Sequence, residues 1–172
     1  MHFDMPIEQL VRRADTRFQL GFAAEAQRLV PEGDDFRLQP GAQGLTVLGR
    51  NEDSLGRPIG VLKEIYAAKL RIEPPRVRVI RDGQVKEPVM HLRISLQTRF
   101  IDPVARAMLG RGCVPAEEYA RGKYCVLRYE APLADLLGLP EELRRITGGT
   151  AEHRMALSHY ALVTRDPGGN AA

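Results

Sequence analysis

The chain has 172 residues and a formal net charge of +3 at pH 7, with 44% hydrophobic and 27% charged residues. This composition is typical of a globular protein with one large or two small domains, and it excludes a membrane-spanning helix because no apolar run is long enough. The small net charge does not by itself predict nucleic-acid binding, since Arg and Lys are interleaved with Asp and Glu.

The first half of the sequence predicts the order strand, helix, strand, strand, helix, strand. Apolar residues alternate over 3–7 and then recur at helical spacing over 8–30. The runs 36–38 and 45–47 alternate on either side of a loop with Pro and Gly, which indicates a hairpin. A second helix is expected after Asn51, with Pro58 in its first turn. One further strand follows, which starts at 70–72, is interrupted by Pro74-Pro75 and resumes over 77–79.

The same order begins again after the turn at Asp82-Gly83. The predicted elements are a strand over 89–96, a helix over 102–109, a short strand at Val114, a turn over 119–122, a strand over 124–131, a helix over 133–146 and a strand over 153–160. This repetition predicts an α+β protein with two tandem ferredoxin-like (βαββαβ) domains, residues 1–82 and 84–165, each an antiparallel sheet with helices on one face. Residues 166–172 are expected to be a disordered tail.

One stretch, 143–160, resembles the end of domain V of the translational GTPases. Elongation factor G has the pattern L-R-x-x-T-x-G-x-G-x-x-x-M-x-x-x-H-Y there, and the TypA/BipA branch ends its strand in S-H-Y. The matching residues are Leu143, Arg144, Thr147, Gly149, Met155, Ser158, His159 and Tyr160. The family's second loop glycine is replaced by Ala151.

Further motifs extend this resemblance along the chain. Residues 87–90 (E-P-V-M) are similar to the opening of domain V, and residues 35–38 (D-F-R-L) are similar to a segment of domain III. Residues 79–88 join the two halves directly, as in TypA/BipA, where no domain IV intervenes. The resemblance therefore implies a domain III-like part over 1–82 and a domain V-like part over 84–165, without a GTPase domain or domain IV.

The sequence gives no sign of catalysis. It has no G-x-x-x-x-G-K-[ST] loop, so we expect neither GTP binding nor any other cofactor. His153 and His159 lie too far apart on one strand to share a metal ion, and the adjacent glutamates Glu141 and Glu142 do not share a helix face. We therefore expect a protein that is not an enzyme and has no metal site.

The strongest candidate site is the helix end and glycine loop over 144–150. Arginines beside free backbone amides are suited to phosphate oxygens, and the resemblance implies contact with ribosomal RNA for this kind of surface. The candidate RNA-binding residues are Arg144, Arg145, Thr147, Gly148, Gly149 and Thr150, with Arg106 and Arg111 as further candidates of the same type. In the alternative interpretation, Arg144 only caps the helix and the glycines only form the turn.

Two functions are compatible with these observations. The resemblance implies a cytoplasmic, non-catalytic relative of translation factors that binds the factor-binding region of the ribosome or modulates a translational GTPase. The alternative is a ferredoxin-like binding or assembly module, with a protein partner or a small ligand, that no longer acts on the ribosome. Neither hypothesis requires a membrane partner.

Overall fold

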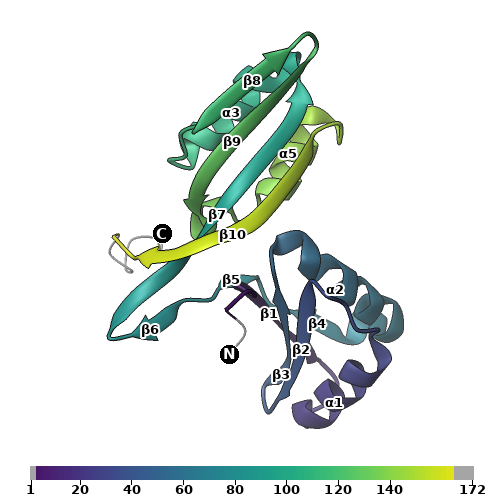
Figure 1. Cartoon of the computed structure of the whole chain (residues 1–172). Coiled ribbons are helices and arrows are strands. Elements are labelled where there is room, and N and C mark those ends of the chain that lie inside the picture. Colours follow the sequence, from purple (N-terminus) through teal and green to yellow (C-terminus); the bar gives the residue numbers. More distant parts are fainter. Residues whose placement is uncertain (1–2, 165–172) are drawn as a thin grey trace. The chain divides into compact units, whose positions relative to one another are not determined.

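The computed structural model of the chain describes residues 3–164 (Figure 1). It divides into two compact units, Met1–Arg78 and Val79–Ala172. The sequence prediction placed residues 79–82 in the first unit. They belong to the second, because β6 (Ile80–Asp82) forms a hairpin with the start of β7 (Gln84–Gln97). The predicted tail, 166–172, lies outside the described residues.

The first unit is an antiparallel sheet with two helices on one face (Figure 1). Its elements are β1 (Ile7–Arg13), α1 (Gln19–Leu29), β2 (Phe36–Gly41), β3 (Gly44–Gly49), α2 (Glu52–Tyr66), the 3-10 turn η1 (Ala67–Lys69), β4 (Leu70–Ile72) and β5 (Arg76–Val77). The strand order is β2-β3-β1-β4, and β5 also pairs with β1. This arrangement confirms the predicted ferredoxin-like fold.

The start of this unit differs from the prediction. Residues 8–13 were predicted to begin a helix, but they belong to the central strand β1, and α1 begins only at Gln19. The spacing of Leu10, Val11 and Ala14 fits a helix. However, β1 pairs with β3 along one edge and with β4 and β5 along the other. Backbone hydrogen bonds to strands on both sides override a weak local preference.

Helix α2 begins at a capping box. The Asn51 side chain accepts a hydrogen bond from the Ser54 amide (3.0 Å), and the Asn51 amide donates one to Ser54 Oγ (3.2 Å). This box fixes the start of the helix at Glu52, so Pro58 lies inside the helix and not in its first turn as predicted.

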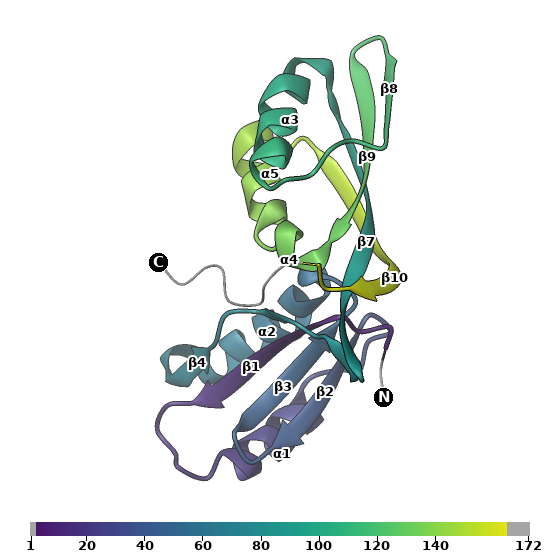
Figure 2. The ribbon, with the colours of Figure 1, turned by 90° about the vertical axis from the view of Figure 1, so that its left-hand side faces the viewer.

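The second unit repeats the fold. After β6 and β7 come the 3-10 turn η2 (Thr98–Phe100), α3 (Ile101–Gly110), β8 (Glu117–Arg121), β9 (Tyr124–Pro132), α4 (Leu133–Leu136), α5 (Leu139–Thr147) and β10 (Glu152–Leu162). The strand order is β10-β7-β9-β8, again antiparallel and again ferredoxin-like, with β6 on β7. Figure 2 shows α3, α4 and α5 together on one side of this sheet. Within residues 3–164, no helix is long and apolar enough to cross a bilayer.

Strand β8 was not predicted. The sequence suggested a strand at Val114 and a turn over 119–122, whereas the strand is Glu117–Arg121 and pairs with β9. All five of its side chains are exposed, so it has no alternation of buried and exposed residues to recognise.

Alternation is clear on the two central strands of this sheet. Leu92, Ile94, Leu127 and Tyr129 are buried on the side that the helices cover. The residues between them, among them Arg93, are exposed on the other side, which no helix within residues 79–164 covers (Figure 2). We call this second side the open face.

Candidate nucleic-acid interface

The predicted arginines Arg144 and Arg145 lie on α5 with exposed side chains. Their side chains are 61% and 77% exposed, and each pairs with a glutamate one turn earlier on the same helix, Arg144 with Glu141 and Arg145 with Glu142. The second pair is long, at 4.0 Å. Ion pairs on an exposed helix surface contribute little to stability, so both arginines remain accessible to another anion.

The glycine loop after α5 does not offer free amides. Gly148 has a left-handed backbone (φ 63°), and its amide and that of Gly149 both donate to the carbonyl oxygen of Arg144. The Thr150 amide donates to the carbonyl of Thr147 (3.3 Å), and the Ala151 amide donates to Thr147 Oγ1 (3.2 Å). The expectation of free amides is therefore wrong: the loop satisfies the carbonyls at the end of the helix.

Thr147 is a structural residue of this loop. It is only 2% exposed, and its hydroxyl donates to the carbonyl of Leu143 at 2.7 Å. Thr150 Oγ1 in turn donates to the carbonyl of Thr147 at 2.7 Å. The assignment of this loop to RNA binding stays a prediction, but the contacts would have to come from the side chains of Arg144 and Arg145.

Arg111, another predicted RNA-binding residue, connects two helices. It lies just after α3, and its guanidinium donates to Glu142 Oε2 on α5 (2.5 and 3.0 Å) and to the carbonyls of Asp135 (2.9 Å) and Leu137 (2.8 Å). Only 21% of the side chain is exposed. These bonds hold the break between α4 and α5, so the guanidinium has few donors left for a phosphate.

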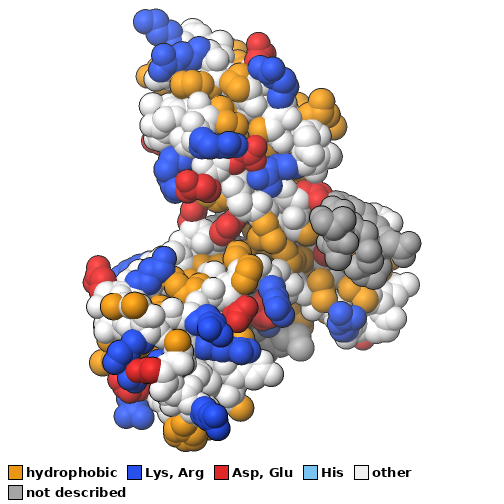
Figure 3. Space-filling model, turned by 180° about the vertical axis from the view of Figure 1, so that it is seen from behind, with side chains coloured by type: hydrophobic (Ala, Val, Ile, Leu, Met, Phe, Trp, Pro, Cys, Tyr) orange, Lys and Arg blue, Asp and Glu red, His pale blue; other side chains and the backbone are white. Residues whose placement is uncertain are grey.

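Arg106 lies on α3 and is exposed, with one long bond from its Nε to the carbonyl of Asp102 (3.4 Å). Figure 3 shows the helix side of the second unit, where Lys and Arg are dispersed among acidic and apolar side chains. The predicted basic residues of the helix side therefore do not form one dense patch.

A Ser–His–Glu contact that sequence reasoning missed joins two strands. Ser158 Oγ lies 2.9 Å from His159 Nδ1, and Glu130 Oε1 lies 3.4 Å from the same nitrogen. A catalytic triad needs the serine and the acid on opposite nitrogens of the imidazole, so this contact lacks the required geometry. Among residues 3–164, no three His, Cys, Asp or Glu side chains are placed to hold a metal ion.

The two cysteines are free thiols in the core of the second unit. Cys113 and Cys125 are both buried. Burial raises the pKa of the Cys125 thiol, and it raises the pKa of the neighbouring phenol of Tyr129 to about 12. Both groups therefore stay protonated at neutral pH, which makes the Cys125 thiol a poor nucleophile.

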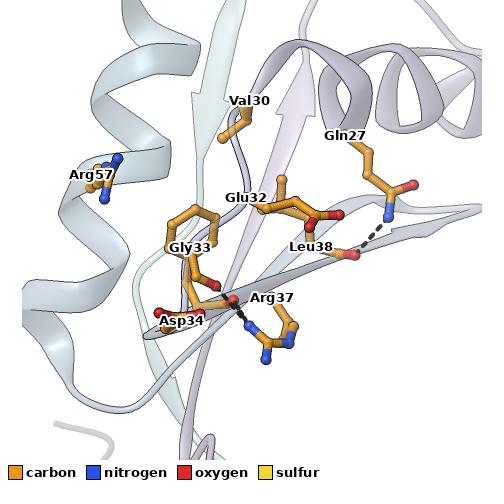
Figure 4. A pocket seen from close by; sticks show the side chains of 9 residues that line it. Gln27, Val30, Glu32, Gly33, Asp34, Arg37, Leu38 and Arg57 are labelled. Carbon is orange, nitrogen blue, oxygen red and sulfur yellow. Dashed lines mark hydrogen bonds between the residues drawn. The ribbon is translucent and has the colours of Figure 1, made fainter.

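The first unit has an open cavity of about 500 Å³ between the end of α1, β2 and α2 (Figure 4). Arg37 Nη1 donates to the carbonyls of Gly33 (2.7 Å) and Phe36 (2.8 Å), and Gln27 Nε2 donates to the carbonyl of Leu38 (3.1 Å). These hydrogen bonds hold the loop that leads into β2. The acidic residues Glu32 and Asp34 line the same cavity together with Arg37 and Arg57, so its charged groups are of both signs and do not select an anion.

A row of three arginines on the open face of the second unit was also not predicted. Arg154 on β10 lies opposite Arg93 on β7, and Arg93 lies opposite Arg128 on β9. In the sequence, Arg93 and Arg128 each stand between apolar residues, and this alternation could have placed both arginines on the exposed side of a strand. Their alignment across three strands depends on the register, which the sequence alone did not provide.

Comparison with known proteins assigns the second half of the chain to a family. The family model described as Elongation factor G C-terminus matches residues 84–169, half of the chain. Elongation factor G 2 of Hahella chejuensis is 38% identical over 76 residues, 44% of this chain and 11% of that protein. The mitochondrial ribosome-releasing factor 2 of Culex quinquefasciatus is 34% identical over 82 residues, 47% of this chain and 11% of that protein.

The mitochondrial ribosome-releasing factor 2 of Bos taurus is 31% identical over 80 residues, which is 46% of this chain and 10% of that protein. The matched part thus spans about a tenth of the length of these curated relatives. A crystal structure of a Thermus thermophilus protein has a TM-score of 0.65 and 14% identity, and the match covers 92% of this chain and 41% of that one. At this identity the likeness concerns the fold alone.

Proposed function

This chain belongs to the elongation factor G C-terminus family, and on that basis we propose that it is a non-catalytic relative of translation factors that binds ribosomal RNA in the factor-binding region. The family match over 84–169 carries the proposal, and it confirms the resemblance of the second unit's motifs. Relatives named as an elongation factor and as ribosome-releasing factors support a role related to translation. Assigning the first unit as domain III-like is part of the same proposal.

The contact surface in this proposal is the exposed end of α5. The guanidinium groups of Arg144 and Arg145 can each bind a phosphate through two parallel N–H···O bonds. Their present partners, Glu141 and Glu142, lie on the same helix, and exposed ion pairs of this kind are weak. Exchanging a carboxylate for an RNA phosphate therefore costs little stability.

In this proposal the protein acts by binding and does not catalyse a reaction. It would occupy the region that translational GTPases use, or modulate such a factor there, and it would do so in the cytoplasm with the ribosomes. The sequence has no phosphate-cradling loop, which supports a role without nucleotide hydrolysis.

One observation favours the alternative, a binding or assembly module that does not act on the ribosome. The amides of Gly148, Gly149 and Thr150 are used within the chain, and Arg111 is committed to Glu142 and two carbonyls. Much of the predicted phosphate site is therefore already occupied by contacts within the chain. Under this alternative, the arginines of α5 would be solvated surface residues.

Co-sedimentation with purified ribosomes separates the two functions. We expect the wild-type chain to pellet with ribosomes at low salt and to be released as the salt concentration rises, because phosphate contacts release counterions. The double variant Arg144→Ala/Arg145→Ala should bind more weakly by about 2–4 kcal/mol, from about 1–2 kcal/mol per charge-assisted phosphate contact. It should fold normally, since both side chains are exposed.

The matched control removes two exposed arginines from the first unit, Arg17→Ala/Arg28→Ala, which lowers the net charge by the same amount. It should pellet like the wild type. Wild-type chain that stays in the supernatant at low salt would overturn the proposed function in favour of the binding module. Equal loss in both double variants would show a nonspecific charge effect and would exclude the α5 site.

A further inference from the structure

The open face of the second unit holds an arrangement of charge that the fold alone does not explain. Arg93 lies directly opposite an arginine on both neighbouring strands, Arg154 on β10 and Arg128 on β9, and all three side chains are exposed. Residues directly opposite in an antiparallel sheet have Cβ atoms about 4.5–5.5 Å apart, and like charges at these positions are destabilising. Repulsion among the three arginines therefore lowers the stability of the free protein, and a bound polyanion would relieve this repulsion.

Three acidic side chains share this face, and they neutralise the row only in part. Among residues 3–164, Glu130 and Glu152 form no ion pair with it. Glu117 lies opposite Arg128 and pairs with it at 3.6 Å, but both groups are more than half exposed. Within the described part of the chain, neither Arg93 nor Arg154 has a side-chain hydrogen bond or ion pair. Two of the three guanidinium groups are therefore free to bind phosphate oxygens.

Aromatic side chains lie beside the row on the same face. On β9, Tyr124 and Val126 alternate with the buried residues and therefore lie on the open face with Arg128. Tyr119 is directly opposite Val126, so it lies on the same face. They are 64% and 66% exposed, far more than a tyrosine that contributes to a core. Planar rings exposed on a sheet, next to cations, match the chemistry of bases stacked on aromatic residues.

An open depression continues this surface at the turn between β8 and β9. It has a volume of about 510 Å³ and is lined by Gln97, Thr98, Arg99, Gly122, Lys123 and Tyr124. Its charged lining groups, Arg99 and Lys123, are both cationic. The open face thus carries a basic depression, two exposed rings and a row of arginines.

We propose that the open face of the second unit binds single-stranded RNA, with bases stacked on Tyr119 and Tyr124 and phosphates bound by Arg93, Arg128 and Arg154. A single strand fits because its bases are free to stack on a flat sheet, whereas a duplex hides them. The choice of RNA over DNA rests on the proposed function. This surface is separate from the α5 site, since it lies on the opposite side of the sheet (Figure 2).

The test is fluorescence anisotropy of a labelled uridine oligonucleotide of about 12 nucleotides, a length within the range of single-strand sites. The wild-type chain should bind it with an affinity that falls as salt rises from about 50 to 200 mM. In Arg93→Gln/Arg154→Gln, the slope of log K against log salt should become shallower by about 1.4, from about 0.7 per phosphate contact on a single strand.

Substitution of the two tyrosines is expected to change the affinity but not its salt dependence. Tyr119→Leu and Tyr124→Leu keep an apolar strand residue but remove the ring, so each should weaken binding about tenfold and leave the salt slope unchanged. The control Arg17→Gln/Arg28→Gln should keep both the affinity and the slope. All variants should retain the wild-type unfolding midpoint or exceed it, because every substituted side chain is exposed.

Several results would overturn the inference: no binding of the oligonucleotide at low salt, equal loss in the control, or equal affinity for duplex RNA. Equal affinity for single-stranded DNA would overturn the assignment to RNA. If the oligonucleotide is bound but ribosomes do not pellet the chain, only the proposed function fails. If ribosomes pellet the chain but the oligonucleotide is not bound, only this inference fails.

Discussion

Two groups of arginines in the second unit lie on opposite sides of one sheet and are used differently. On the helix side, Arg111 is largely buried and its donors are taken by Glu142 and two carbonyls. On the open face, Arg93 has arginines on both sides and no hydrogen bond or ion pair with a described residue. A basic residue is therefore a candidate ligand site only where the fold has not already used its donors.

The glycine loop shows the same contrast between donors used within the fold and donors that remain accessible: its backbone amides are used, and the side chains beside it have only weak ion pairs. The amides of Gly148 and Gly149 complete the end of α5, whereas Arg144 and Arg145 are exposed to solvent with weak partners. Three substitutions test the comparison, and each is expected to separate a structural role from a binding role.

The largest expected effect is at Arg111. Arg111→Ala removes the ion pair to Glu142 and two bonds to carbonyls, and it leaves these partly buried acceptors without a donor. We expect a loss of about 2–4 kcal/mol in the free energy of unfolding, measured by urea denaturation. The control is Arg106→Ala on α3, the helix that ends just before Arg111, and it should change stability by no more than about 0.5 kcal/mol. Similar stability in both variants would show that Arg111 does not hold the helices together.

A smaller effect is expected at Gly148. Nothing lies within 4 Å of a Cβ built at this position, so Gly148→Ala adds only the cost of a left-handed backbone (φ 63°). That cost is about 1 kcal/mol or slightly more. Ribosome co-sedimentation and oligonucleotide binding should not change, because the loop acts as a helix cap. Loss of binding at unchanged stability would instead assign the loop to the ligand.

The smallest expected effect has the opposite sign. Arg93→Gln removes a charge from between two others, so it should stabilise the chain by about 0.2–1 kcal/mol. The gain should shrink at high salt, where exposed charges are screened. Urea unfolding at low and high salt measures both quantities. A destabilised variant would mean that Arg93 supports the sheet, and the contrast with Arg111 would then disappear.

Much of the fold followed from the sequence because alternation and helical spacing are strong in the second unit. The strands β7, β9 and β10 cover the stretches where the alternation placed them, although β7 already begins at Gln84. The single helix predicted over 133–146 is instead divided at Gly138 into α4 and α5. The pattern failed for β1, which is a strand because of its two neighbours, and for β8, whose side chains are all exposed. Both errors concern strands that tertiary pairing specifies.

The candidate site was harder to predict than the fold. That Arg144 and Arg145 are exposed could be anticipated from an amphipathic helix end, but the partners of Arg111 lie 24 to 31 residues further along the chain. The arginine row requires the register of three strands at once. Which donors are free is a property of the folded chain, and sequence spacing does not reveal it.

Chemical probing of ribosomal RNA with and without the purified chain tests the central claim most directly. We predict that nucleotides of the factor-binding region become protected when the wild-type chain is added at low salt. The protection should be lost with Arg144→Ala/Arg145→Ala and retained with Arg17→Ala/Arg28→Ala. Unchanged reactivity of this region at a saturating concentration of wild-type chain would contradict ribosome binding by this member of the elongation factor G C-terminus family.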